Sequence, residues 1–110
     1  MNIEDIRMYC LSKPDVEEAL PFGNDTLVFK VGGKIFLLVG MDSQPIQFNV
    51  KCDPERAVEL REQYDCIIPG YHMNKKHWNT VVIDNTLSTK QLKEQIDHSY
   101  DLVKPKKKSR

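Results

Sequence analysis

Three short segments between residues 26 and 51 constrain the fold more than any other feature of this chain. Segments 26–31 and 46–51 alternate apolar and polar side chains, as strands with one buried face do. Segment 34–40 is apolar on both faces, which is typical of a strand with neighbours on each side. Gly32-Gly33 separates the first two segments and suits a two-residue turn in which both positions need positive φ. The pattern predicts three strands, the first two joined as a hairpin.

Three helices are predicted around these strands. The first spans 3–11 behind an Asn2 N-cap, and the second starts at Asp53, which can cap its free N–H groups. The last helix starts with a capping box of Ser88 and Gln91. The side chains expected to face the core from the second and last helices are Ala57, Leu60, Tyr64, Leu92, Ile96, Ser99 and Val103.

Two more strands, 66–68 and 78–83, and a single helical turn at 15–20 complete the predicted elements. Their order is α-β(3)-α-β(2)-α, and hairpin connections favour an antiparallel five-stranded sheet with helices packed on one side. We therefore expect an α+β two-layer sandwich in a single domain, residues 1–103. Residues 104–110 form a basic tail that we expect to be disordered.

Basic residues are distributed unevenly, although the formal net charge is zero. The tail holds five of the sixteen Lys and Arg residues, so residues 1–103 carry eleven basic and sixteen acidic residues, a formal charge of −5. A dedicated DNA-binding domain normally presents a basic face on its folded body. The tail alone offers weak, salt-sensitive contact with a polyanion, or serves as a solubilising end.

Cysteine usage and the N-terminus indicate a cytoplasmic protein. Cys10, Cys52 and Cys66 are odd in number and widely spaced, so we expect buried, reduced thiols rather than disulfides or a zinc site. Residues 1–6 lack the features of a signal peptide, and no apolar run reaches the roughly 20 residues of a membrane helix. No membrane partner is expected.

Residues 69–78, PGYHMNKKHW, concentrate two aromatics, two histidines and two lysines after a turn signal. Positive charge beside stacking surface is what single-strand or phosphate-backbone recognition requires. Trp78 opens a predicted strand, however, and a core-anchoring role is the interpretation we favour for the aromatics of this segment. That interpretation leaves the lysines as a small local patch.

Catalytic constellations are not evident in the sequence. His72 and His77 are five residues apart, which is not the i, i+4 spacing of two metal ligands on one helix face. Ser99 follows His98 directly, and adjacent helical residues point in different directions, so they cannot form a nucleophile–base pair. We expect no enzymatic activity, no metal and no cofactor.

Five segments carry a resemblance to a known family: 18–23 (EALPFG), 28–36 (VFKVGGKIF), 50–55 (VKCDPE), 69–78 (PGYHMNKKHW) and 99–103 (SYDLV). On these segments the chain resembles the MmcQ/YjbR family of small bacterial proteins. The resemblance implies a fold similar to the type III secretion chaperones and a DNA-binding role, without established catalytic residues or cofactor. It also implies a shared surface that includes Pro21, Phe22 and Gly23.

Three functions are compatible with these features, and we favour the first. A nucleic-acid-binding module requires the lysines to converge on one face while the acidic excess lies elsewhere. A protein-interaction module, chaperone-like and dimerising, predicts an exposed apolar patch. A small-ligand binder predicts a pocket lined by Phe22, His72, His77 and Trp78. The residues predicted to bind DNA or a protein partner are Lys30, Lys34, Lys51, Tyr71, His72, Asn74, Lys75, Lys76, His77 and Trp78.

Overall fold

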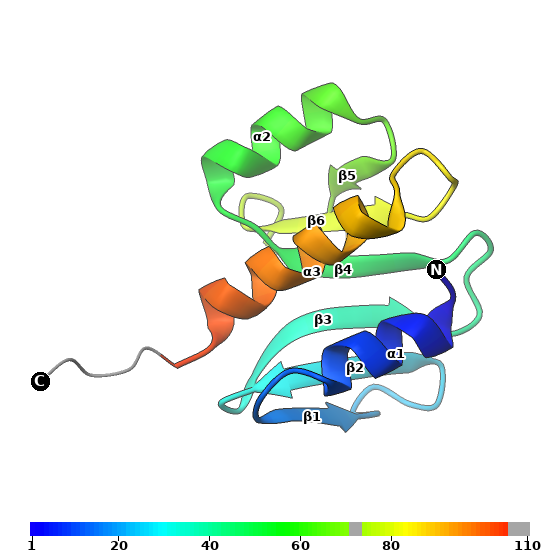
Figure 1. The fold of residues 1–110 in the computed structure, drawn as a ribbon, viewed down its shortest axis with the longest axis vertical. Coiled ribbons are helices and arrows are strands. Elements are labelled where there is room, and N and C mark those ends of the chain that lie inside the picture. Colours follow the sequence, from blue (N-terminus) through cyan, green and yellow to red (C-terminus); the bar gives the residue numbers. More distant parts are fainter. Residues whose placement is uncertain (71–73, 106–110) are drawn as a thin grey trace, which may run out of the picture.

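The computed structural model describes residues 1–70 and 74–105, which form three helices and six strands. Figure 1 shows all three helices on the same side of a single sheet. In chain order the elements are α1 Ile3–Leu11, β1 Val16–Ala19, β2 Thr26–Val31, β3 Lys34–Gly40, β4 Gln47–Lys51, α2 Pro54–Gln63, β5 Ile67–Pro69, β6 Trp78–Val82 and α3 Thr89–Val103.

All neighbouring strands of the sheet are antiparallel, in the order β1-β2-β3-β4-β6-β5. Strand β3 lies between β2 and β4, as its apolar residues on both faces predict. Gly32 and Gly33 join β2 to β3 with φ of 61° and 79°, so the predicted hairpin turn is confirmed. The α+β two-layer class is confirmed as well, with six strands rather than five.

Strand β1 corrects the helical turn predicted at 15–20. Its four residues, Val16–Ala19, pair antiparallel with Val28–Val31 of β2. Asp15 precedes them with φ of 63°, a left-handed conformation that cannot start a right-handed helix. So short a segment is also costly to nucleate as a helix, whereas the edge of β2 pairs its backbone groups directly. The element order is therefore α-β(4)-α-β(2)-α.

Local capping explains where the helices begin. At α1, Asn2 Oδ1 accepts from the Asp5 N–H at 2.8 Å and Asp5 Oδ2 accepts from the Asn2 N–H at 3.0 Å. The predicted capping box of α3 is confirmed, since Ser88 Oγ accepts from the Gln91 N–H at 3.1 Å and Gln91 Oε1 accepts from the Ser88 N–H at 2.9 Å. Asp53 caps α2, as predicted.

The hydrophobic core lies between the helices and one face of the sheet. Helix α1 contributes Ile6 and Cys10, and α3 contributes Leu92, Ile96 and Val103. The buried sheet residues of the core are Leu27, Phe29, Val31, Phe36, Leu37, Val39, Phe48, Val50, Ile67 and Val81. Over the opposite face of the sheet, no helix of the described residues is packed; we call this the open face (Figure 1).

A β-bulge in β3 explains why two consecutive residues, Phe36 and Leu37, both belong to the core. Phe29 pairs with Leu37 but Lys30 pairs with Ile35, so Phe36 is the extra residue. The hydroxyl of Ser99 on α3 donates to the Phe36 carbonyl at 2.6 Å and accepts from the backbone N–H of Lys51 at 2.8 Å. One buried hydroxyl thus satisfies a carbonyl of β3 and an N–H of β4.

Within 1–70 and 74–105, no helix has the length and hydropathy of a membrane span.

Candidate functional site

Strand register places three of the predicted site residues on the open face. Lys30 pairs with Ile35, and Lys51 pairs directly with Trp78 across β4 and β6. Their neighbours along each strand, such as Phe29, Val50 and Asn79, are fully or almost fully buried on the helix side. Because successive strand residues point to opposite faces, the side chains of Lys30, Lys51 and Trp78 all lie on the open face, with Lys51 directly beside Trp78.

The other predicted lysines lie at the same end of the sheet. Figure 1 shows the β2–β3 turn, the end of β4 and the start of β6 on the left. Lys34 follows the turn, and the loop carries Lys75 and Lys76. We call Lys30, Lys34, Lys51, Lys75 and Lys76 the basic end. Among the residues that the structure describes, none of these five forms an ion pair.

Acidic residues dominate the loops at the opposite end of the sheet. Loops 20–25, 41–46, 64–66 and 83–88 each contain one aspartate, and none contains Lys or Arg. The four aspartates are Asp25, Asp42, Asp65 and Asp84. Lysines therefore gather at one end of the sheet although residues 1–103 are acidic overall; Asp15, before β1, and Asp53, after β4, also lie at that end.

Helix α3 also ends at the basic end. A Cβ built on Gly32 would lie 2.6 Å from Cγ of Pro105, so Pro105 packs directly against the β2–β3 turn. The residues that follow, 106–110, belong to the predicted disordered tail and lie outside the described residues.

Trp78 does not belong to the hydrophobic core, contrary to the core-anchoring role that we favoured for it. It is half-buried and is absent from the cluster of core residues and from the side chains packed against that cluster. Across the strand edge, the Gly70 N–H donates to the Trp78 carbonyl at 3.0 Å. A Cβ on Gly70 would lie 3.0 Å from Cβ of Trp78, so glycine allows the two strands to approach closely at Trp78.

Hydrogen bonds from the side chain and backbone of the loop before β6 hold its second half in place. Asn74 Oδ1 accepts from the Lys76 N–H at 2.9 Å, and the Asn74 carbonyl accepts from the His77 N–H at 3.0 Å. The His77 carbonyl accepts from the Cys52 N–H at 2.7 Å, which ties the loop to the end of β4. The predicted residue Asn74 thus shapes the turn that presents Lys75 and Lys76. Tyr71 and His72, also predicted site residues, lie outside the described residues.

Arg61 on α2 fastens the same loop, and our sequence analysis missed it. Its Nε donates to Oδ1 of the buried Asn79 at 2.7 Å, and its Nη2 donates to the carbonyl of Trp78 at 3.0 Å. Nη2 also donates to the Lys75 carbonyl. The sequence indicates this role, because Arg61 lies four residues after Ala57 and therefore falls near the side of the helix that faces the core.

The pocket predicted for a small ligand is not formed as expected. Phe22 lies in the β1–β2 loop, at the end of the sheet opposite His77 and Trp78, so these residues cannot line one cavity. His72 lies outside the described residues. Phe22 is instead 62% exposed, with Leu20 at 46% and Met41 at 39% in the loops of the same end. The Met41 N–H donates to the Asp25 carbonyl at 2.8 Å, which joins the two loops.

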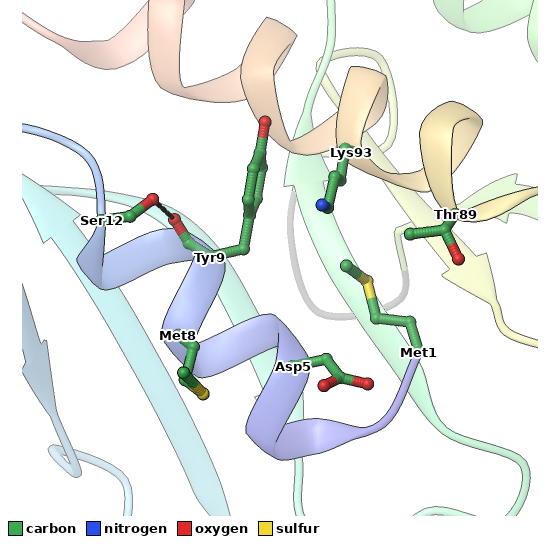
Figure 2. A pocket seen from close by; sticks show the side chains of 7 residues that line it. All are labelled: Met1, Asp5, Met8, Tyr9, Ser12, Thr89 and Lys93. Carbon is green, nitrogen blue, oxygen red and sulfur yellow. Dashed lines mark hydrogen bonds between the residues drawn. The ribbon is translucent and has the colours of Figure 1, made fainter.

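A groove of about 490 Å³ lies between α1 and α3, on the helix side of the molecule (Figure 2). Its lining residues are Met1, Asp5, Met8, Tyr9, Ser12, Thr89 and Lys93. The Tyr9 hydroxyl donates to Asp97 Oδ1 at 2.6 Å, and burial raises the pKa of Tyr9 to about 12. Lys93 Nζ lies 4.9 Å from the centroid of the Tyr9 ring. These groups serve helix packing, and the groove includes none of the predicted site residues.

Nucleophilic side chains of the described residues are buried or engaged. All three cysteines are free and buried, as predicted, and burial raises the pKa of the Cys52, Cys66 and Cys10 thiols, that of Cys10 to about 12. His98 Nε2 accepts from the Asp53 N–H at 3.2 Å, while Ser99 bonds to Phe36 and Lys51. His98 and Ser99 thus point to different partners. In residues 1–70 and 74–105, no three His, Cys, Asp or Glu side chains are grouped as metal ligands.

Comparison with known proteins gives consistent matches over the whole domain. A family model described as YjbR matches residues 11–102. The uncharacterized protein YbdF of Escherichia coli O157:H7 is 41% identical over 101 residues, 91% of this chain and 82% of that protein. The uncharacterized protein YjbR of Escherichia coli K12 is 32% identical over 100 residues, 91% of this chain and 85% of that protein.

Solved structures have the same fold. The crystal structure of Deinococcus radiodurans protein DR2400 matches with a TM-score of 0.88 and 41% sequence identity, over 93% of this chain and 78% of that one. The crystal structure of a Pseudomonas syringae protein matches with a TM-score of 0.80 and 28% identity, over 94% of this chain and all of that one.

Proposed function

The chain belongs to the YjbR family, and we propose that it is a non-enzymatic module that binds nucleic acid through the basic end. The five lysines of the basic end form no ion pair with the described residues and lie at one end of the sheet. The observation that carries the proposal is the register that sets Lys51 against Trp78, with Lys30 on the same face. The positive charge of Lys51 therefore lies next to the aromatic side chain of Trp78, and binding to a nucleic acid strand uses both.

The placement of four aspartates in the far loops weakens the main objection to this proposal. A formal charge of −5 over residues 1–103 opposes binding to a polyanion if the charge is spread evenly. The aspartates of the far loops lie a strand length away from the basic end, about 16 Å for five residues at 3.3 Å each. Since this distance exceeds the Debye length of about 8 Å at physiological salt, their repulsion at the basic end is largely screened.

A non-enzymatic role is supported by what the reactive groups do. The three thiols are buried with raised pKa values, which disfavours the nucleophilic thiolate. His98 accepts a hydrogen bond from the backbone at the start of α2. Ser99 joins β3 to β4. Each of these groups therefore has a structural role.

Fluorescence anisotropy with a labelled oligonucleotide at about 50 and 200 mM salt tests the proposal. The key variant is Lys75→Ala/Lys76→Ala, and the matched control is Lys90→Ala/Lys93→Ala, which removes the same charge from α3 on the helix side. A third variant keeps the full chain length but changes Lys106, Lys107, Lys108 and Arg110 to Ser. We expect the first variant to bind more weakly, with a salt slope smaller by about 2, and the control to bind like the wild type.

Two results would contradict the proposal. Binding that vanishes only in the tail variant would assign the interaction to nonspecific charge outside the folded site. Equal weakening by the basic-end variant and by its α3 control would indicate a response to net charge alone.

A second candidate function is protein interaction, and one specific feature favours it. Leu20, Phe22 and Met41 expose apolar side chains in joined loops, beside Asp25 and Asp42. Exposed apolar side chains gathered in this way are a common mark of protein–protein contact sites. By analogy with secretion chaperones, such a patch would hold a partner segment or a second copy of the chain. Under this alternative, Phe22→Ser is expected to abolish binding to the partner segment or to a second copy of the chain, although the basic end is unchanged.

A further inference from the structure

We propose that the nucleic acid bound at the basic end is single-stranded and that one of its bases stacks on the indole of Trp78. This inference rests on the proposed function and specifies the form of the ligand. It follows from where the indole lies, from the shape of the surface around it and from the order of side chains along the open face.

Trp78 is half-buried and does not belong to the core. A large aromatic side chain contributes most to stability when it packs in the core. Trp78 instead lies on the open face, outside the core cluster, with Gly70 beside it and the Lys51 side chain on the adjacent strand. An aromatic face next to an ammonium group provides a stacking platform and a phosphate contact for the same nucleotide.

The surrounding surface is a sheet face, which favours a single strand over a duplex. The major groove of B-DNA is about 12 Å wide and admits a helix or a two-stranded ribbon, but not a broad sheet. All three helices lie on the other side of the sheet (Figure 1). The β2–β3 turn is the ribbon nearest the lysines, but it packs against Pro105.

The order of side chains along the open face gives a path for the strand. From β6 to β2 the face presents Trp78, Lys51, Ile35 and Lys30, over three strand spacings of about 4.8 Å each. Glu17 pairs with Lys30 on the edge strand β1 and places a negative charge at the end of this row. The strand of nucleic acid is thus expected to cross from β6 toward β2 and to end before β1.

Intrinsic fluorescence provides a direct test, because Trp78 is the one tryptophan of the chain. We would titrate the full-length protein with an unlabelled oligothymidine strand and, separately, with a duplex of equal length. Anisotropy with labelled versions of both oligonucleotides is measured in parallel. We expect the single strand to quench the fluorescence of Trp78 and to bind more tightly than the duplex.

Variants at Trp78 separate stacking from folding. Trp78→Leu is expected to weaken single-strand binding by about 5- to 150-fold, the range for loss of one stacked base, while Trp78→Phe retains most of the affinity. Circular dichroism melts show whether each variant is folded. If Trp78→Leu does not fold, the quenching of the wild-type protein decides the question alone.

The outcomes distinguish this inference from the proposed function. Lysine-dependent binding to both oligonucleotides without quenching would overturn the stacking inference and leave nucleic-acid binding standing. Preference for the duplex would overturn the inference in the same way. Absence of binding to either oligonucleotide would overturn both and direct attention to a protein partner at the far loops.

Discussion

Arg61 donates a hydrogen bond from Nε to Oδ1 of Asn79 at 2.7 Å, and Asn79 is fully buried. The same guanidinium reaches the carbonyl groups of Lys75 and Trp78, so one side chain of α2 connects the basic loop with β6. Asn79 Nδ2 has no hydrogen-bond partner among the described residues, which makes its Oδ1 the engaged end of the amide. Arg61 is therefore a positioning residue for the proposed site.

Arg61→Ala is predicted to destabilise the protein by about 1–3 kcal/mol, the cost of leaving a buried polar group unpaired. Urea denaturation followed by circular dichroism measures this loss. Arg56→Ala, on the exposed side of the same helix, is the control and should change stability by less than about 0.5 kcal/mol. If Arg61→Ala is no more destabilising than Arg56→Ala, the hydrogen bonds of Arg61 do not hold the loop.

Gly32 and Gly33 form a matched pair for testing how α3 ends against the β2–β3 turn. Both have positive φ, so alanine at either position costs about 1–2 kcal/mol of backbone strain. A Cβ at Gly32 would also meet Pro105 at 2.6 Å, whereas a Cβ at Gly33 meets nothing within 4 Å. Thermal melts should therefore show a larger loss for Gly32→Ala than for Gly33→Ala. Equal losses would mean that Pro105 does not pack on the turn.

His98 is predicted to make stability depend on pH. Burial, followed by the nearby charge of Arg56, lowers the pKa of His98 below its ordinary value of 6.5. The unfolded chain then binds this proton more readily than the folded protein does, so the contribution is fully present above about pH 6.5 and is lost as the pH falls below it. We expect the melting temperature of the wild type to drop more steeply between about pH 7 and 5 than that of His98→Gln. If the melting temperatures of the two proteins fall equally over this pH range, His98 does not have this role.

Ser99→Ala is predicted to destabilise the protein by about 1–3 kcal/mol, because the buried Phe36 carbonyl and Lys51 N–H both lose their partner. Ser12→Ala removes an exposed hydroxyl that donates to the Tyr9 carbonyl, and this control should cost well under 1 kcal/mol. Denaturation midpoints of the two variants give the comparison. A loss for Ser99→Ala as small as that of Ser12→Ala would show that water replaces the hydroxyl.

Features specified by neighbouring residues could be predicted from the sequence. The caps at Asn2, Asp53 and Ser88 and the Gly32-Gly33 turn each depend on a few consecutive residues, and all four are confirmed. Strand β1 was mistaken for a helical turn because its pairing with β2 involves residues about a dozen positions away. Four residues carry too little periodicity to distinguish the two structures.

In the candidate site, too, features set by neighbouring residues could be predicted and contacts between distant residues could not. Alternation alone predicts that Lys30 and Lys51 face away from the core, and the register confirms it. Arg61 was missed because its partner Asn79 lies 18 residues away in the chain. Phe22 was grouped with His77 and Trp78 through the family motifs, but chain topology places the β1–β2 loop at the other end of the sheet.

Nuclear magnetic resonance of the ¹⁵N-labelled full chain, titrated with an unlabelled single-stranded oligonucleotide, locates the binding site residue by residue. We expect the backbone amides of Lys30, Ile35, Lys51 and Trp78 and the indole N–H of Trp78 to shift together and to saturate. Amides of the far loops, including Phe22 and Met41, should stay in place. Shifts confined to residues 104–110, or centred on Phe22 and Met41, would contradict the assignment of the binding site to the basic end.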